Sequence, residues 1–441
     1  MKNNTIKTRL AAMSFLEFGV WGAYLISMGQ FLAANGLGTE IFWFYTIQGI
    51  VSIFMPAVMG IIADRWIPAQ KTFALCHVLA GAFMIASGLA AWQNISVGEA
   101  IDFGKVFPLY TLSVAFYMPT VALGNSVAFN ALAKYGLSSV TDFPPIRTLG
   151  TVGFICAEVA VSFISIGGEE IQNSVWQWYL SGGLSFILAL YALTLPNCPC
   201  NTGVKKTLAD SLGLSAFKLF KHREMAIFFI FSMLLGVSLQ ITNAYGSDFI
   251  RFFAQIPEYA NGFLDGWFAH KSVLLISVSQ CAEAICILLI PYCLKRFGIK
   301  GVMLIAMFAW MLRFFLFGIG DTNFPGVVWL FLSCVVYGVA FDFFNVSGGI
   351  FVELRAEPAQ RSSAQGLFML MTNGIGASIG TFIAGKYVVN NLVLRDASVQ
   401  EQLVGWHHSW LIFAAYALVV AVLFMVIFRE PKKQENTEGQ K

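Results

Sequence analysis

The sequence contains about twelve long apolar windows separated by short polar gaps, and this pattern limits the possible folds. A helix needs about 20 apolar residues to cross a bilayer, and lipid admits only helices or closed barrels. Only 12% of the residues are charged, against about 25% in soluble domains. We therefore expect an all-α integral membrane protein. The windows are 10–33, 41–63, 72–92, 106–132, 145–166, 174–195, 225–250, 271–293, 301–319, 325–352, 363–390 and 408–428.

The longest interior polar gap lies near the centre of the chain, from Asn197 to Glu224. Equal numbers of apolar windows precede and follow this gap, which is the layout of a carrier built from two six-helix halves. The basic residues of the gap are Lys205, Lys206, Lys218, Lys221 and Arg223. The predicted domains are an N-terminal half (1–196), a basic cytoplasmic linker (197–224), a C-terminal half (225–430) and a cytoplasmic tail (431–441).

The positions of lysine and arginine predict the orientation, because cytoplasmic connections carry an excess of both. They gather in alternate connections and at both ends of the chain, so both termini are expected in the cytoplasm. The loops 252–270 and 391–407 would then be external, and each is long enough for short surface helices. The basic residues outside the linker that set this orientation are Lys2, Lys7, Arg9, Arg65, Lys71, Lys134, Lys295, Arg296, Lys300, Arg355, Arg361, Arg429, Lys432 and Lys433.

A basic turn follows the second apolar window and reads Gly60-Ile-Ile-Ala-Asp64-Arg65. It resembles the G-x-x-x-D-R loop motif of the major facilitator superfamily, although Trp66-Ile-Pro-Ala replaces the usual glycine and basic residues that follow. A second basic turn stands at the corresponding place after the eighth window. The resemblance implies a gating role for Gly60, Asp64 and Arg65, and an ordinary basic inner loop is the alternative.

An aspartate lies within the tenth window, in Tyr337-Gly-Val-Ala-Phe-Asp-Phe-Phe-Asn345. A charged side chain near the middle of a span costs roughly 3 kcal/mol, so Asp342 is expected to face a water-filled cavity or a partner. Tyr337, Phe341 and Asn345 are spaced i, i+4 and i+8 and share one helical face, which Asp342 borders. Aromatic rings beside carboxyl and amide groups suit a flat polar molecule. A hydrogen bond that joins two helices is the alternative.

The fifth window places Arg147, Thr151 and Phe154 at i, i+4 and i+7, on one helical face. An arginine offers a rigid fork of donors for substrate oxygens or for an acid on a facing helix. The alternative is an interfacial arginine whose head group reaches toward water.

Two further windows carry polar pairs at i and i+3: Gln240 with Asn243, and Gln280 with Glu283. Each pair presents an amide beside a second polar group on one stripe. Because two such pairs occur in neighbouring spans, they favour a polar cavity. Bonding between helices is the alternative.

Glu283 and Asp342 are the candidates for proton binding, because a carboxyl in a low-dielectric cavity can exchange protons near neutral pH. Glu17 is a further acid that could reach the cavity. Glu158 and Arg313 are interpreted as structural, and Arg313 could pair with an acid elsewhere. His77 is interpreted as a satisfied packing residue.

At these residues the chain resembles the bacterial nucleoside:proton symporters, the nucleoside permease family of the major facilitator superfamily. The matching stretches run nearly end to end, and as a set they are more specific than the loop motif. They are Ser14-Phe-Leu-Glu-Phe with Trp21-Gly22, Phe54-Met-Pro-Ala57, Tyr117-Met-Pro-Thr120, Thr141-Asp-Phe-Pro-Pro-Ile-Arg147, Met225 to Gly236, Leu239-Gln-Ile-Thr-Asn243, Phe341-Asp-Phe-Phe-Asn345 and Met371-Thr-Asn-Gly374.

The resemblance implies a substrate site between the halves, near the middle of the membrane. Amides and carboxylates would hold the ribose hydroxyls and the base edge, while aromatic rings stack on the base. Glu17 departs from the family, whose members carry glutamine there; an extra acid would alter coupling or substrate preference, or have no effect. The implied site residues are Arg147, Thr151 and Phe154 of the first half and Gln240, Asn243, Gln280, Glu283, Tyr337, Phe341 and Asp342 of the second.

The leading hypothesis is a proton-driven nucleoside importer of the bacterial inner membrane that works by alternating access, for which a monomer is sufficient. The alternatives are a carrier of another polar solute such as a sugar, with or without proton coupling, and a membrane receptor that moves nothing. An enzyme is disfavoured because no nucleophile–base set lies at membrane depth. The cysteines lack metal spacing, and no cofactor is expected. The net charge of +3 is too small to indicate nucleic acid.

Overall fold

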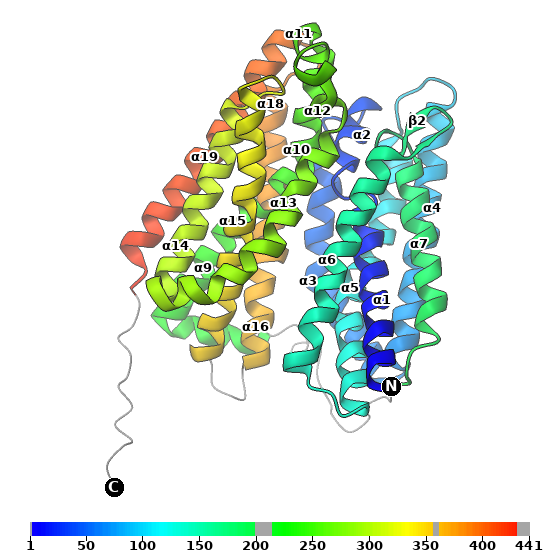
Figure 1. Cartoon of the computed structure of the whole chain (residues 1–441), viewed down its shortest axis with the longest axis vertical. Helices are drawn as coiled ribbons and strands as arrows, with labels where there is room; N and C mark the ends of the chain where they lie inside the picture. Colours follow the sequence, from blue (N-terminus) through cyan, green and yellow to red (C-terminus); the bar gives the residue numbers. More distant parts are fainter. Residues whose placement is uncertain (1, 199–213, 356–360, 430–441) are drawn as a thin grey trace.

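The structure is a computed structural model that describes residues 2–198, 214–355 and 361–429, most of them helical. The predicted cytoplasmic tail and the larger part of the predicted linker lie outside these residues. Helices α1 to α7 form one group and α9 to α19 form a second, and the two groups lie side by side (Figure 1). We call them the N-terminal and C-terminal halves, following the predicted division of the chain.

The N-terminal half consists of long helices and one short strand pair. Strands β1 (Ser165–Ile166) and β2 (Glu169–Glu170) pair antiparallel after α6, and the 3₁₀ turn η1 (Ile171–Asn173) leads into α7. The sequence did not predict this hairpin. The helices are α1 (Lys2–Gly22), α2 (Met28–Ala34), α3 (Ile41–Arg65), α4 (Ala69–Ile95), α5 (Phe103–Lys134), α6 (Ser139–Phe163) and α7 (Trp176–Ala192).

The C-terminal half begins with η2 (Leu214–Lys221) and is more often interrupted. Outside its first long loop, the further elements are α9 (Arg223–Leu239), α10 (Ile241–Phe252), α13 (Ser272–Cys286), η5 (Ile287–Leu289), α14 (Ile290–Ile319), α15 (Gly326–Arg355), α16 (Arg361–Met369), η7 (Leu370–Gly376), α17 (Ala377–Ile383), η8 (Ala384–Val389), α18 (Asn390–Leu392) and α19 (Val399–Ile427). The first long loop holds the short helices that its length predicted: η3 (Phe253–Gln255), α11 (Pro257–Ala260), η4 (Phe263–Gly266) and α12 (Trp267–His270).

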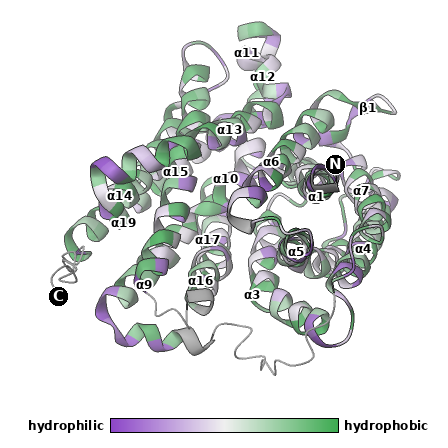
Figure 2. Ribbon diagram, turned by 60° about the horizontal axis from the view of Figure 1, so that its bottom comes forward, coloured by the Kyte–Doolittle hydropathy of each residue, from purple (hydrophilic) through white to green (hydrophobic). Residues whose placement is uncertain are grey.

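The predicted apolar windows coincide with these helices. In the described chain, 9 stretches are long and apolar enough to cross a membrane. One of them, 272–319, holds two predicted spans, because Gly298 interrupts α14 with a positive φ of 70°. The first and sixth windows correspond to α1 with α2 and to α7. Apolar residues cover most of the helices, and hydrophilic residues gather toward helix ends and connections (Figure 2).

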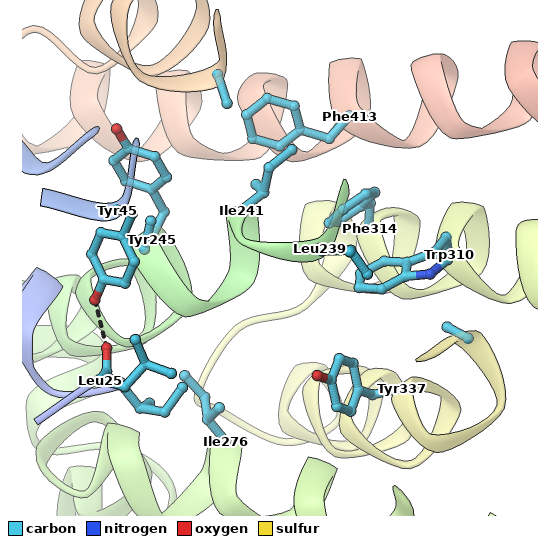
Figure 3. Close-up of a cluster of buried hydrophobic side chains, with 14 of the residues drawn as sticks. Leu25, Tyr45, Leu239, Ile241, Tyr245, Ile276, Trp310, Phe314, Tyr337 and Phe413 are labelled. Carbon is cyan, nitrogen blue, oxygen red and sulfur yellow. Dashed lines mark hydrogen bonds between the residues drawn. The ribbon is translucent and has the colours of Figure 1, made fainter. Parts of the chain in front are cut away.

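The most extensive contacts between the halves join α2 with α10, α6 with α13, and α3 with the η7–α17 segment. One buried apolar cluster includes side chains from both halves. Figure 3 shows part of it, where the Tyr45 hydroxyl of α3 donates to the backbone oxygen of Leu25 at 2.6 Å, beside Tyr245 of α10. The start of α1 and the end of α19 lie at the same end of the molecule (Figure 1). We call this end the terminal end and the opposite one the outer end.

Within the N-terminal half, α1 and α6 pack closely through glycines. A Cβ added at Gly22 would lie 2.5 Å from the backbone oxygen of Phe154, and one added at Gly153 would lie 2.0 Å from that of Phe15. Small residues let the backbones of membrane helices approach closely. This contact fixes the face of α6 that carries Arg147 and Phe154 relative to α1.

We predict that Gly153→Ala destabilises the protein, because its methyl group would force α1 and α6 apart. Overpacking of this kind costs roughly 1–3 kcal/mol. The measurement is the thermal unfolding midpoint of the purified protein in detergent. Gly183→Ala on α7 is the matched control, since nothing lies within 4 Å of its added Cβ. Equal midpoints for the two variants would contradict the close contact.

Candidate functional site

Helix α6 presents Arg147, Thr151 and Phe154 along one face, as their spacing predicts. The guanidinium carbon of Arg147 lies 3.9 Å from the ring centroid of Phe18 on α1. The Phe154 ring meets Trp21 edge to face, with centroids 6.3 Å apart. Phe154 is buried, whereas Arg147 and Thr151 are half-buried. The cation–π contact holds the arginine head against α1 without using its hydrogen-bond donors.

Gln240 and Asn243 lie where the predicted seventh span is broken. Gln240 ends α9 and precedes α10 (φ −97°, ψ −8°), so the span consists of two helices rather than one. The Asn243 side-chain nitrogen donates to the Gln240 side-chain oxygen at 2.9 Å. Both side chains are half-buried. Discontinuous helices that carry polar groups are typical of substrate sites in membrane carriers.

Helices α13 and α15 supply the remaining predicted side chains. They pack tightly, because a Cβ added at Gly338 would lie 2.5 Å from the backbone oxygen of Ala282. On α15 the rings of Tyr337 and Phe341 stack, with centroids 5.5 Å apart and planes at 19°. The Gln280 side-chain oxygen and one Asp342 carboxylate oxygen are buried without a hydrogen-bond partner in the described chain.

Three of the predicted site residues interact with one another electrostatically. Arg147 interacts electrostatically with both Glu283 and Asp342, and the two carboxyl groups interact with each other. Among the described residues, no ion pair joins Arg147 to either acid. One cation therefore faces two carboxyl groups across the boundary between the halves. This set is neutral when one carboxyl group holds a proton.

Arg313 has neutral partners in the described chain rather than an acid. This fully buried α14 side chain donates to the hydroxyls of Thr242 (3.2 Å) and Ser279 (3.3 Å) and to the backbone oxygen of Ser333 (3.1 Å). Its guanidinium carbon lies 4.3 Å from the ring centroid of Tyr337. Neutral acceptors on α10, α13 and α15 thus satisfy the charge, and Arg313 supports the aromatic part of the site.

Glu17 lies inside the N-terminal half rather than open to the boundary between the halves. Its carboxylate oxygens lie 2.7 Å from the Nε2 atom of His77 and 2.6 Å from the hydroxyl of Thr120. The Nδ1 atom of His77 lies 3.2 Å from the Ser185 hydroxyl. His77 is therefore a satisfied buried residue, as predicted, but its partner is an acid rather than apolar packing. Spacing could not reveal this pair, because the two residues lie on different helices.

The predicted gate residues lie at the end of α3. Asp64 and Arg65 are exposed, and the space around Gly60 is open to an added Cβ. Their gating role remains a prediction.

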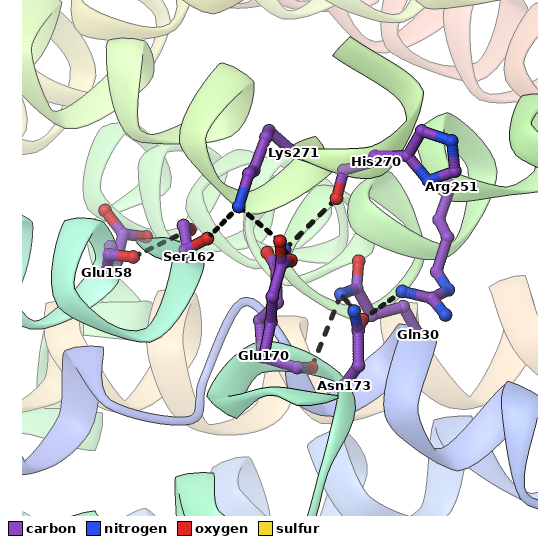
Figure 4. A network of polar contacts seen from close by, with 9 residues as sticks. Gln30, Glu158, Ser162, Glu170, Asn173, Arg251, His270 and Lys271 are labelled. Atoms are coloured by element: carbon purple, nitrogen blue, oxygen red, sulfur yellow. Dashed lines mark hydrogen bonds and ion pairs between the residues drawn. The ribbon is translucent and has the colours of Figure 1, made fainter. Parts of the chain in front are cut away.

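A polar network at the outer end was not predicted (Figure 4). Lys271 bonds to the Glu170 carboxylate and, at 2.5 Å, to the backbone oxygen of Ser162. Asn173 accepts from Arg251 and, at 2.9 Å, from Gln30. We call these six residues the outer network. Glu170, Asn173 and Lys271 come from short connections, and no periodicity marks residues of that kind.

A separate ion pair ties α10 to the connection before α19. The Arg395 guanidinium lies 2.6 Å from the Asp248 carboxylate. Burial disfavours the charged form of Arg395 and acts to lower its pKa. The Asp248 carboxylate favours the charged form more strongly, so the pKa of Arg395 is raised above its ordinary value. The outer part of α10 is thus fixed within its own half. It is also bonded to the other half, because the Ser247 hydroxyl donates to the backbone oxygen of Ile26 at 2.6 Å.

Comparison with solved structures shows which proteins share this fold. A crystal structure of the nucleoside transporter NupG superposes with a TM-score of 0.84 at 40% identity, and the match covers 97% of this chain and 100% of that one. A D-xylose–proton symporter superposes with a TM-score of 0.66 at 13% identity. This second likeness shows the fold alone.

Comparison of sequences gives the family. The xanthosine permease of Escherichia coli (strain K12) is 44% identical, with 97% of this chain and 98% of the relative covered. The nucleoside permease NupG of the same organism is 42% identical, with 96% of each chain covered. These relatives are transporters rather than enzymes. Residues 4–433 match the family described as "Nucleoside H+ symporter", and the chain belongs to that family.

Proposed function

We propose that this protein carries nucleosides into the cell together with protons, through a site at the boundary between its two halves. The observation that carries the proposal is the meeting of Arg147 from the N-terminal half with Glu283 and Asp342 from the C-terminal half. Buried ionisable groups are costly in a membrane and mark ion or substrate pathways. Family membership supplies the substrate class.

In this proposal each kind of side chain contacts a different part of the nucleoside. The stacked rings of Tyr337 and Phe341 bind the face of the base, because aromatic rings prefer flat, offset partners. The bonded amides of Gln240 and Asn243 offer a donor and an acceptor to the ribose hydroxyls or the base edge. Arg147 presents further donors from the opposite half. Thr151, Phe154 and Gln280 complete the proposed site.

In this proposal, protons take part in transport because a bound proton balances the charges of the site. With both acids ionised the site holds one positive and two negative charges, and one bound proton makes it neutral. A neutral site is easier to enclose in low dielectric than a charged one. Closure around a nucleoside and a proton together is therefore favoured over closure around the nucleoside alone, which is the coupling that a symporter needs.

Alternating access requires the outer end to open and close, and the bonds between the halves support a state closed there. Lys271 joins the C-terminal half to Glu170 and Ser162 of the N-terminal half, and Arg251 joins Asn173. We propose that these bonds break when the outer end opens. We also propose that both termini are cytoplasmic and that one chain forms the whole transport unit.

The proposed function predicts uptake of labelled uridine, adenosine and xanthosine into vesicles that contain the purified protein. Xanthosine is included because a relative is a xanthosine permease. An inward proton gradient should drive accumulation, and an ionophore that dissipates the gradient should abolish it. Saturable uptake that ignores the gradient would leave a facilitator. Absence of nucleoside uptake by folded protein, with uptake of a labelled sugar, would leave a carrier of another solute.

Asp342→Asn should abolish accumulation above the external concentration, because an amide cannot take up and release the proton. Downhill exchange of nucleoside should continue. The measurement is gradient-driven uptake compared with counterflow in the same vesicles. Asp265→Asn, at an exposed loop position, is the matched control. Accumulation by Asp342→Asn equal to that of the unmodified protein would remove Asp342 from proton coupling.

Gln240→Ala and Asn243→Ala should each weaken nucleoside binding while the protein stays folded. One uncharged hydrogen bond contributes about 0.5–1.5 kcal/mol, and about 1.4 kcal/mol is tenfold in affinity, so the expected loss is roughly 2- to 10-fold. The measurement is the Kd for uridine by calorimetry on purified protein. Gln255→Ala, at an exposed position beyond α10, serves as control. Unchanged affinity in both variants would place the broken span outside the site.

A further inference from the structure

Glu158 continues the substrate-facing stripe of α6. Relative to Arg147 it stands at i+11, after Thr151 at i+4 and Phe154 at i+7, so all of them share one helical face. It therefore lies one turn beyond Phe154, toward the outer end. From the sequence, Glu158 is interpreted as a structural residue. A structural role for a buried carboxyl group requires a hydrogen-bond or ion-pair partner.

The described chain provides no such partner. Glu158 is 0% exposed, and neither of its carboxyl oxygens has a hydrogen-bond partner. The other fully enclosed acid of this half, Glu17, bonds to both His77 and Thr120. An ionised carboxylate without a donor or cation is very costly to bury, so this environment accommodates the neutral carboxyl group.

The groups that interact electrostatically with Glu158 come from the C-terminal half. They are Glu283 and Cys281 on α13 and Tyr337 and Cys334 on α15. Glu283 is one of the proposed proton-coupling acids. Glu158 is therefore an acid of the N-terminal half that faces the proton-binding groups of the other half.

On its outer side, Glu158 is linked to the outer network. The Ser162 hydroxyl donates to the backbone oxygen of Glu158 at 2.8 Å, and the Lys271 ammonium donates to the backbone oxygen of Ser162 at 2.5 Å. Figure 4 shows Glu158, Ser162, Lys271 and Glu170 in succession. The carboxyl group thus lies between the bonds that close the outer end and the acid at the site.

We propose that Glu158 is a further proton-binding residue of the transport cycle, placed between the outer network and Glu283. When the outer end opens and the bonds of Lys271 to the N-terminal half break, water reaches the Glu158 carboxyl group. Glu158 passes its proton to the Glu283 carboxylate and takes another from external water. The outer end closes again only over a protonated Glu158, because the closed state leaves the carboxylate without a donor. Chains of acidic side chains serve as proton relays in other membrane carriers.

This inference rests on the proposed proton coupling, and the test compares variants with the unmodified protein in the same vesicles. Glu158→Gln keeps the size and the neutral state of the side chain but cannot exchange the proton. It should lose gradient-driven accumulation, and its counterflow should fall less steeply than that of the unmodified protein as the external pH rises, because only the protons of Glu283 and Asp342 then contribute. Its Kd for uridine should change by less than about twofold, because the neutral form is retained.

Three further variants complete the design. Glu158→Leu should behave as Glu158→Gln does, although it has no amide that could form new bonds. Glu158→Asp retains an exchangeable proton and should keep accumulation. Cys156→Ala, at an exposed position on the same helix, should behave as the unmodified protein. Thermal unfolding of each variant establishes that it is folded.

Infrared spectroscopy gives a readout that does not depend on transport. The unmodified protein should show a protonated-carboxyl band that is absent from Glu158→Gln. Absence of that band difference overturns the inference, as does accumulation by Glu158→Gln with the pH profile of the unmodified protein. A large loss of uridine affinity with an unchanged pH profile also overturns it, since Glu158 would then be a substrate contact. Failure of the unmodified protein to respond to the gradient would instead overturn the proposed function.

Discussion

A charged side chain in a membrane helix needs a partner or water, and the structure depends on how this requirement is met at each position. Arg313 is satisfied by neutral acceptors from three helices of one half. Glu17 is satisfied by His77 and Thr120 within the other. These groups stabilise their own half and are independent of the contact between halves. Arg147 differs, because its charge also interacts with Glu283 and Asp342 across the boundary.

That difference separates residues that hold each half together from residues that respond when the halves move. A rigid half requires close helix contacts, which the glycines of α1 and α6 provide. The boundary has few fixed bonds at the level of the site and several at the outer end, where Lys271 and Arg251 reach the opposite half. The site can therefore change its protonation and its occupant while the interior of each half stays as it is.

The sequence predicted the parts of this arrangement that follow from periodicity. Apolar length predicted the spans, and i, i+4 and i+7 spacing predicted which residues of α6 share one helical face. Periodicity could not predict which distant helices contact one another. The neutral partners of Arg313 and the His77–Glu17 pair depend on which helices become neighbours, and half of the outer network comes from short connections. The break at Gln240 was missed because its flanking residues read as one continuous apolar run. The roles of the site residues remain predictions.

The break at Gln240 has a mechanical consequence. Below it, α9 packs against η7 and α17 of its own half. Above it, Ser247 of α10 is bonded to Ile26 of the other half. Helix α10 is therefore held by both halves, since Asp248 also pairs with Arg395 of its own half. The amides of Gln240 and Asn243 lie where α9, which packs within its own half, meets this doubly attached helix. Movement of one half against the other would therefore load α10 from both sides, directly beside the polar pair.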